Sequence, residues 1–270
     1  MKKRLLAVVM AVVMAIALCA PALGEAGDNS LDALKARGKL ILGMDDKFPP
    51  MGFRNEAGEL IGFDVDLARA VCERLGVELE LQTIEWSSKE LELSSGNIDC
   101  IWNGMSRTAE REESMTLSLD YMNNQMVFLC NNAAFASRDD LAGKVVAVQS
   151  GSFADDLIND ASFGDLKATL GEVRGYPDYI MAIMDMQNGN VDAVLIDLVV
   201  ANYRIAGFAD DTLFTMDPLM DDLFCIGFRK GEVQLRDAID ETMVSMQADG
   251  SLGRIAEVWF GENISIIPAA

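Results

Sequence analysis

Short apolar runs of strand length alternate with helical patterns along nearly the whole chain. Residues 39–44 and 144–149 are compact apolar runs, and residues 77–84 alternate polar and apolar side chains. Segments with helical spacing stand between these runs. Strands that alternate with helices in this way build mainly parallel sheets that helices cover. The sequence therefore predicts an α/β fold.

The clearest helical segment spans residues 62–75. Its apolar side chains recur at helical spacing, at Phe63, Leu67, Ala70, Val71 and Leu75. Asp64 and Asp66 lie in the first turn, where a negative charge suits the helix dipole. Gly76 is the expected C-cap. A second helix is expected from Pro177 to about residue 188, where Gly189 ends it.

The first 26 residues have the features of a signal peptide. Lys2, Lys3 and Arg4 precede an apolar run over residues 5–18, which is short for a membrane span. Small residues place the cleavage after Gly24 or Ala26. We therefore expect an extracytoplasmic protein. A lipid anchor on Cys19 stays an alternative, although Leu18 stands where a lipoprotein signal has a small residue.

Composition excludes several classes of function. The chain has no histidine, which removes Ser-His-Asp and Cys-His nucleophiles and His-ligated metals, so no cofactor or metal is expected. Its net charge of −21 disfavours nucleic-acid binding. The cysteines that follow the leader show no CxxC pair and suit small buried side chains: Cys72, Cys100, Cys130 and Cys225. The sequence does not decide whether Cys72 and Cys100 form a disulfide.

Unusual side chains follow the ends of five predicted strands. Ligands of open α/β sheets bind outside the carboxyl ends of the strands, so these loops are expected to share one rim. They comprise residues 45–53 after the first strand, Trp86 after the second, residues 104–111 after a strand at 98–103, residues 150–153 after the strand at 144–149, and Asp197 after a strand at 191–196.

Arg111 is the strongest single candidate for binding. Thr108 is a plausible N-cap, which would put Arg111 in the first turn of a helix, where the dipole disfavours a cation. A guanidinium can grip a carboxylate with two parallel hydrogen bonds. The alternative is a surface ion pair with one of the neighbouring glutamates: Glu110, Glu112 or Glu113.

Three stretches together resemble one protein family. Residues 62–75, the Gly-Met-Ser-x-Thr-x-x-Arg pattern of residues 104–111 and the Trp-Phe-Gly of residues 259–261 are similar to motifs of the extracytoplasmic solute-binding proteins that serve polar amino acid ABC importers. The resemblance implies a two-lobed type II periplasmic-binding fold, each lobe a mainly parallel sheet flanked by helices. Lobe I would comprise residues 27–123 and 222–262, and lobe II residues 126–217. The hinge crossings would lie near 122–127 and 216–222.

The resemblance also implies roles for the residues at the rim. Arg111 would clamp the ligand's α-carboxylate, with help from the loop at Gly104 and Ser106. Asp197 would receive the α-ammonium group, although an N-cap role, typically worth ~1 kcal/mol, is the alternative. Asp45 would help to organise the site.

Further positions match parts of the family's ligand pocket. Phe48 and Trp86 would pack against the aliphatic stem of the ligand, whereas Phe53 is as well explained by a core position. Ser152 and Phe153 open a helix that could meet the ligand carboxylate from the second lobe, with Ser150 or Ser152 as N-cap. Phe153 replaces the smaller residue of many relatives.

The expected function is to bind a free amino acid by hinge closure and to deliver it, as a monomer, to a membrane-embedded permease. The aromatic side chains favour a neutral or partly apolar ligand, while Asp46 and Glu85 leave a cationic one open. No catalysis is expected. The alternative is an enzyme that resembles the cyclohexadienyl or arogenate dehydratases of the same fold, with Glu172 and Asp178 as candidate acids.

Overall fold

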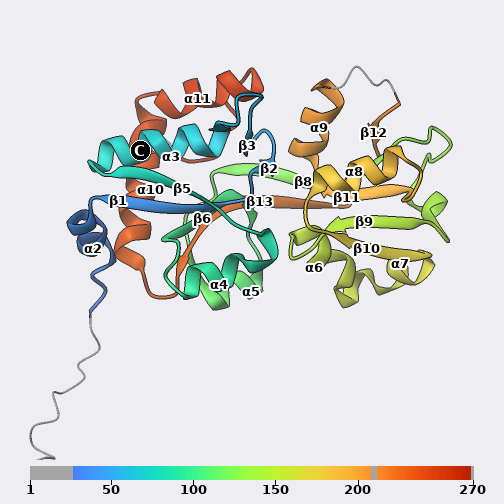
Figure 1. Cartoon of the computed structure of the whole chain (residues 1–270), viewed down its shortest axis with the longest axis horizontal. Coiled ribbons are helices and arrows are strands. Elements are labelled where there is room, and N and C mark those ends of the chain that lie inside the picture. The colour runs from blue at the N-terminus through green and yellow to red at the C-terminus, as the bar shows by residue number, and fades with distance from the viewer. Residues whose placement is uncertain (1–26, 208–211, 269–270) are drawn as a thin grey trace, which may run out of the picture.

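A computed structural model describes residues 27–207 and 212–268, so the predicted signal peptide lies outside the described part (Figure 1). The strands of the main sheet are β1 (Lys39–Met44), β5 (Glu78–Thr83), β6 (Cys100–Ser106), β7 (Met115–Leu117), β8 (Met122–Cys130), β9 (Val145–Gln149), β10 (Glu172–Tyr176), β11 (Ala193–Asp197), β12 (Phe214–Thr215) and β13 (Met220–Arg229). A small sheet contains β2 (Lys47–Phe48), β3 (Gly52–Arg54) and β4 (Leu60–Ile61). The helices are α2 (Ser30–Arg37), α3 (Phe63–Leu75), α4 (Lys89–Ser94), α5 (Ala109–Ser114), α6 (Phe153–Asn159), α7 (Gly164–Thr169), α8 (Tyr179–Gln187), α9 (Leu198–Gly207), α10 (Val233–Ala248) and α11 (Ser251–Phe260).

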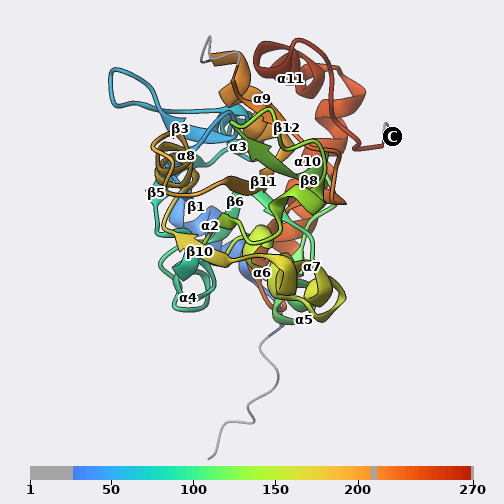
Figure 2. The same ribbon diagram turned by 90° about the vertical axis from the view of Figure 1, so that its right-hand side faces the viewer.

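The elements form two groups that lie side by side (Figure 1). The main sheet has the order β10-β9-β11-β8-β13-β6-β1-β5. In the first group, which we call lobe I, β1 pairs in parallel with β5 and β6. In the second group, lobe II, β9 pairs in parallel with β10 and β11. Helices cover both faces of the sheets (Figure 2). The predicted α/β class with mainly parallel sheets is confirmed.

Two central strands join the lobes. β8 and β13 pair antiparallel from Met122 opposite Phe224 to Met126 opposite Met220. The segments predicted as crossings, near 122–127 and 216–222, overlap this ladder. Asn124 lies directly opposite Asp222 in it. The middle of the sheet therefore carries polar side chains at the point where the two lobes meet.

The helix predicted from residues 62–75 is present as α3. Leu67 and Val71 on its apolar face are completely buried in the core. The N–H of Gly76 bonds to the carbonyl of Cys72 and ends the helix, as predicted. Asp64 lies in the first turn, as predicted, but its side chain is buried rather than exposed to solvent.

Some predicted boundaries were wrong. The helix predicted to start at Pro177 is α8, which begins at Tyr179. Asp178 is its N-cap, because its carboxylate accepts the N–H of Met181. The strand predicted at 98–103 begins at Cys100 and continues to Ser106. The four cysteines after the leader are buried free thiols, so the described structure contains no Cys72–Cys100 disulfide.

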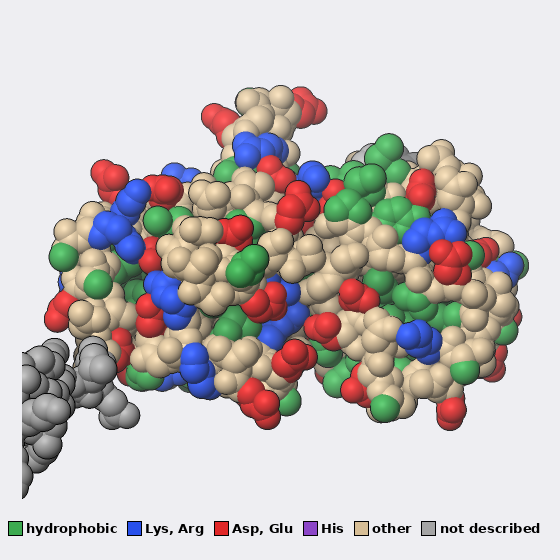
Figure 3. Space-filling model, turned by 60° about the horizontal axis from the view of Figure 1, so that its bottom comes forward, with side chains coloured by type: hydrophobic (Ala, Val, Ile, Leu, Met, Phe, Trp, Pro, Cys, Tyr) green, Lys and Arg blue, Asp and Glu red, His purple; other side chains and the backbone are tan. Residues whose placement is uncertain are grey.

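The surface carries both signs of charge. Acidic and basic side chains are interspersed over the face in Figure 3, with acidic groups on both lobes. In residues 27–207 and 212–268, no helix has the length and apolar character needed to cross a bilayer.

Candidate functional site

One narrow cavity between the lobes gathers all nine residues that the sequence singled out. Six come from lobe I and three from lobe II: Asp45, Phe48, Trp86, Gly104, Ser106 and Arg111, with Ser152, Phe153 and Asp197. Only about 10 Å³ of this cavity is open to the centre of a water molecule. The lobes are therefore closed over it.

Two further residues of the lining were not predicted. Asn103 lies within β6, and Gln149 is the last residue of β9. Gln149 could have been found, because it stands at the carboxyl end of a predicted strand. Asn103 carried the same signal, because it ends the strand predicted at 98–103, although the observed strand continues to Ser106.

Arg111 is held at the start of α5 and points inward. Thr108 caps this helix by accepting the N–H of Arg111 at 3.2 Å, as predicted. The guanidinium, only 4% exposed, donates to the carbonyl of Ser106 at 2.8 Å and lies 3.4 Å from the carboxylate of Asp156 in lobe II. The alternative of a solvated surface pair is wrong. Glu112 pairs with Arg107 instead.

Asp197 ends β11 and is also buried. Its carboxylate accepts a 2.8 Å hydrogen bond from Asn124. The same amide nitrogen donates to Asp222 at 2.9 Å, so two carboxylates share one donor. Burial, followed by the charge of Asp222, raises the pKa of Asp197 to about 8. Such a carboxylate favours a positively charged partner.

A chain of side chains connects this carboxylate with the loop of lobe I. The hydroxyl of Ser106 donates to Asp222 at 2.8 Å, and Asn124 links Asp222 with Asp197. Burial raises the pKa of Asp222 as well. The Oδ1 atom of Asn124 is buried and has no hydrogen-bond partner among the described residues. Asn124 and Asp222 were not predicted as site residues, because they lie in the segments predicted only as crossings.

Asp45 connects the two lobes directly. Its N–H bonds to Asn103 at 3.1 Å, and its carboxylate accepts a 2.7 Å hydrogen bond from Gln149 of lobe II. Burial raises the pKa of this carboxyl to about 6. The neighbouring Lys47 pairs with Asp178 of lobe II at 3.0 Å. Complementary polar groups of the two lobes thus meet beside the cavity.

Aromatic side chains form the apolar walls of the cavity. Phe48 and Trp86 are buried, and the ring centroid of Phe48 lies 5.9 Å from that of Tyr179 in lobe II. Phe53 does not line the cavity. It packs against Tyr203 and Trp259 at centroid distances of 5.6 and 5.9 Å.

Glycine is required at position 104. Its φ of +56° is unfavourable for other residues, and a Cβ there would lie 2.7 Å from Cε1 of Phe48. Asp64 accepts the N–H of Gly104 at 2.8 Å and the hydroxyl of Tyr121 at 3.1 Å. Burial raises the pKa of Asp64 to about 7. This carboxyl therefore fixes the backbone that precedes Ser106.

The loop of lobe II ends in a capped helix. Ser152, rather than Ser150, is the N-cap of α6, because its hydroxyl accepts the N–H of Asp155 at 3.3 Å. Phe153 follows and is partly buried. Its side chain borders both the narrow cavity and a second, larger one.

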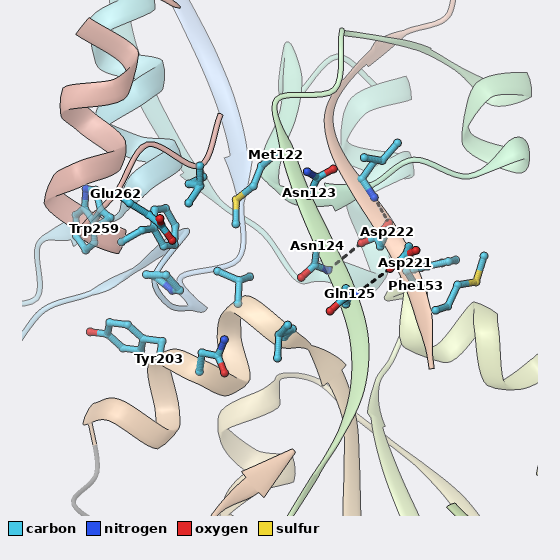
Figure 4. Close-up of a pocket in the computed structure, with 18 of the residues that line it drawn as sticks. Met122, Asn123, Asn124, Gln125, Phe153, Tyr203, Asp221, Asp222, Trp259 and Glu262 are labelled. Carbon is cyan, nitrogen blue, oxygen red and sulfur yellow. Dashed lines mark hydrogen bonds between the residues drawn. The ribbon is translucent and has the colours of Figure 1, made fainter. Parts of the chain in front are cut away.

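The second cavity is an open groove of about 1000 Å³ beside the central strands (Figure 4). Asn123, Gln125 and Asp221 line one side of it, and Tyr203 and Trp259 line the other. Of the nine predicted site residues, the groove contains only Phe153. The narrow cavity, which combines a buried guanidinium with buried carboxylates, is therefore the candidate site.

The two carboxylates considered for catalysis do not line this cavity. Glu172 is exposed and pairs with Arg174 at 2.9 Å. Asp178 is buried, but it caps α8 and pairs with Lys47. Neither residue is arranged as an acid beside the cavity.

Comparisons with known proteins agree with this architecture. A model of the bacterial extracellular solute-binding proteins, family 3, matches residues 40–262. The L-cystine-binding protein TcyJ of Escherichia coli K12 is 29% identical over 258 residues, which are 94% of this chain and 95% of TcyJ.

Solved structures are similar over most of the chain. A substrate-binding protein of an ABC uptake transporter from Streptococcus pneumoniae, with bound histidine, has a TM-score of 0.85 and 34% identity, covering 89% of this chain and 99% of that one. The ancestral amino acid-binding protein AncCDT-1, described as a precursor of cyclohexadienyl dehydratase, has a TM-score of 0.78 and 28% identity, covering 86% and 99%. These relatives are named as binding proteins.

Proposed function

The chain belongs to the bacterial extracellular solute-binding proteins of family 3, and from that premise we propose that it binds one free amino acid between its lobes and delivers it to an ABC importer permease. The observation that carries this proposal is the pairing of opposite charges in one cavity. Arg111 of lobe I and Asp197 of lobe II are both buried there. A zwitterionic amino acid carries the complementary pair of charges.

Binding requires the lobes to separate and close again. A volume of about 10 Å³ is near the minimum that holds one water molecule, so the cavity must widen before it can hold an amino acid. We propose the ladder of β8 and β13 as the hinge between lobe I (27–123 and 222–262) and lobe II (126–217). A ligand that bridges Arg111 and Asp197 gains contacts in the closed form that it lacks in the open one, and this difference drives closure.

The named relatives support recognition of the chemical groups that all amino acids share. Cystine and histidine, which the named relatives bind, have an α-carboxylate and an α-ammonium group in common. The buried rings of Phe48 and Trp86 favour a neutral or partly apolar side chain. Asp46, which suggested a cationic ligand, pairs instead with Arg54 at 2.6 Å.

The family is extracellular or periplasmic, and we propose that this protein works there as a monomer after cleavage of residues 1–26. The intact mass of the exported protein tests this assignment. A chain that begins at Glu25 or Gly27 is expected, whereas an acylated chain that begins at Cys19 would establish the lipid anchor.

The ligand proposal is tested with the leader-free protein. Thermal-shift screening against free amino acids identifies the best ligand, and calorimetry then compares it with its α-amide and its N-acetyl derivative. Each derivative lacks one of the two charges, so both are expected to bind at least roughly tenfold more weakly. Equal binding of the derivatives would contradict the zwitterion site.

A further inference from the structure

Lys89, the first residue of α4, has a completely enclosed cationic side chain. It is 2% exposed, which is rare for lysine unless the ammonium group is paired. Its burial could not be predicted from the sequence, because a single lysine in a helical segment is normally solvated. It belongs to lobe I and directly follows the helical turn that contains Trp86.

The covering atoms belong to lobe II. The ammonium Nζ of Lys89 donates a 2.8 Å hydrogen bond to the carbonyl of Gly151. A Cβ atom on Gly151 would lie 3.0 Å from the Cα of Ser87, so the two backbones are in close contact. Gly151 has a φ of +72°, a backbone conformation that favours glycine. The lobes thus touch each other directly at this point.

Two direct contacts of Lys89 come from its own lobe. Its Nζ lies 2.8 Å from the carboxylate of Glu90 and 5.2 Å from the ring centroid of Trp86. Burial, and then the charge of Arg111, lowers the pKa of Lys89. When the lobes separate, Glu90 and Trp86 can stay beside Lys89, whereas the bond to Gly151 is lost. That bond therefore distinguishes the closed form from the open one.

We infer that Lys89 is a positioning residue that holds the lobes closed through Gly151 and so sets how long a bound amino acid stays, without contacting it. Lys89 does not line the cavity. The adjacent Ser152 does, so the bond to Gly151 also positions a wall of the site. This inference rests on the proposed hinge function.

The test compares Lys89→Met with Lys144→Met. Methionine keeps the apolar length of lysine but removes the donor. Lys144 is a matched control within lobe II, since its Nζ lies 5.4 Å from the ring centroid of Phe135 and 3.6 Å from Asp192, with the same combination of ring and carboxylate. Stopped-flow dissociation is measured for the two best amino acid ligands.

In Lys89→Met we expect both ligands to dissociate roughly tenfold faster. The substitution removes one charge-assisted hydrogen bond, and that bond stabilises the closed form but not the open one. Lys144→Met is expected to match the wild type. Unchanged dissociation from Lys89→Met would overturn the inference. A factor that differs strongly between the two ligands would overturn it as well, because it would indicate direct contact with the ligand.

A measurement without ligand separates this inference from the proposed function. If the wild type binds no amino acid, the proposed function fails, but small-angle scattering still reports the separation of the lobes. Lys89→Met is then expected to have a larger radius of gyration than the wild type and Lys144→Met. Equal radii, with unchanged circular dichroism, would overturn the role of Lys89 in closure.

Discussion

The amide nitrogen of Asn124 donates a 2.8 Å hydrogen bond to the carboxylate of Asp197. Asn124 lies on a central strand, while Asp197 ends a strand of lobe II. The bond therefore orients the carboxylate toward the place where the lobes meet. Because the same nitrogen also bonds to Asp222, the two carboxylates are held close together. A ligand ammonium group would favour the charged form of both carboxylates.

Asp197→Asn is expected to abolish most of the binding and to leave folding intact. Loss of one partner from a buried charge pair typically costs ~2–5 kcal/mol. The folded-state pKa of Asp197 is raised from 3.8 to about 8, so its stability contribution is lost as pH rises through this range. The neutral variant should therefore unfold no more easily than the wild type at pH 8. Calorimetric titration and thermal melts measure both effects. Asp192→Asn, at an ion pair remote from the cavity, is the control and should bind normally.

Ligand affinity is expected to rise with pH between about 6 and 8. Below the raised pKa, Asp197 is mainly protonated in the free protein, and an ammonium ligand must displace that proton. Affinity can then increase by at most about tenfold per pH unit, and it should level off above pH 8. Titrations at pH 7 in buffers of different ionisation enthalpy measure the released proton. Heats that do not depend on the buffer would contradict this expectation.

Arg111→Lys is expected to weaken binding roughly ten- to a hundredfold although the charge is kept. Lysine cannot hold both carboxylate oxygens, and a hydrogen bond to a charged group is worth ~1.5–3 kcal/mol. Arg107→Lys is the matched control, because Arg107 pairs with Asp120 and Glu112. Titrations at constant salt compare the two variants. A similar small loss in both would show that Arg111 does not clamp the ligand.

Gly104→Ala is expected to weaken binding and stability together. The new Cβ would meet Phe48 at 2.7 Å, so the aromatic wall of the cavity must move. Gly189→Ala isolates the backbone effect, since Gly189 has a φ of +77° and no atom within 4 Å of a Cβ. That control should cost about 1 kcal/mol in stability and leave affinity unchanged. Equal effects of the two substitutions on affinity would contradict the steric argument.

Asp64→Leu is expected to destabilise the protein by ~2–5 kcal/mol, because the N–H of Gly104 and the hydroxyl of Tyr121 would both be buried without a partner. Tyr121→Phe removes only one of these bonds and should cost ~1 kcal/mol. Urea denaturation measures both. A free energy of unfolding that is the same in Asp64→Leu and the wild type would rule out this support of the site.

The sequence determined the local elements and the main polar candidates. Apolar periodicity predicts α3 and β1 because it follows from which face of each element is buried, and Thr108 predicts the start of α5 through a contact between near neighbours. The motif around Arg111 identified the family. The nine predicted residues were found because strand ends and family motifs mark them locally.

Tertiary structure alone decided which polar groups are buried together. Lys89 and Gly151 are 62 residues apart, and Asn124 and Asp222 are 98 apart, yet each pair is hydrogen-bonded. Residues 64 and 104 are joined in the same way. No local pattern marks such pairs, because their burial and shifted pKa values arise only when distant strands and lobes exclude water between them. Residue spacing sets helix faces and strand ends, but desolvation depends on the packing of the whole chain.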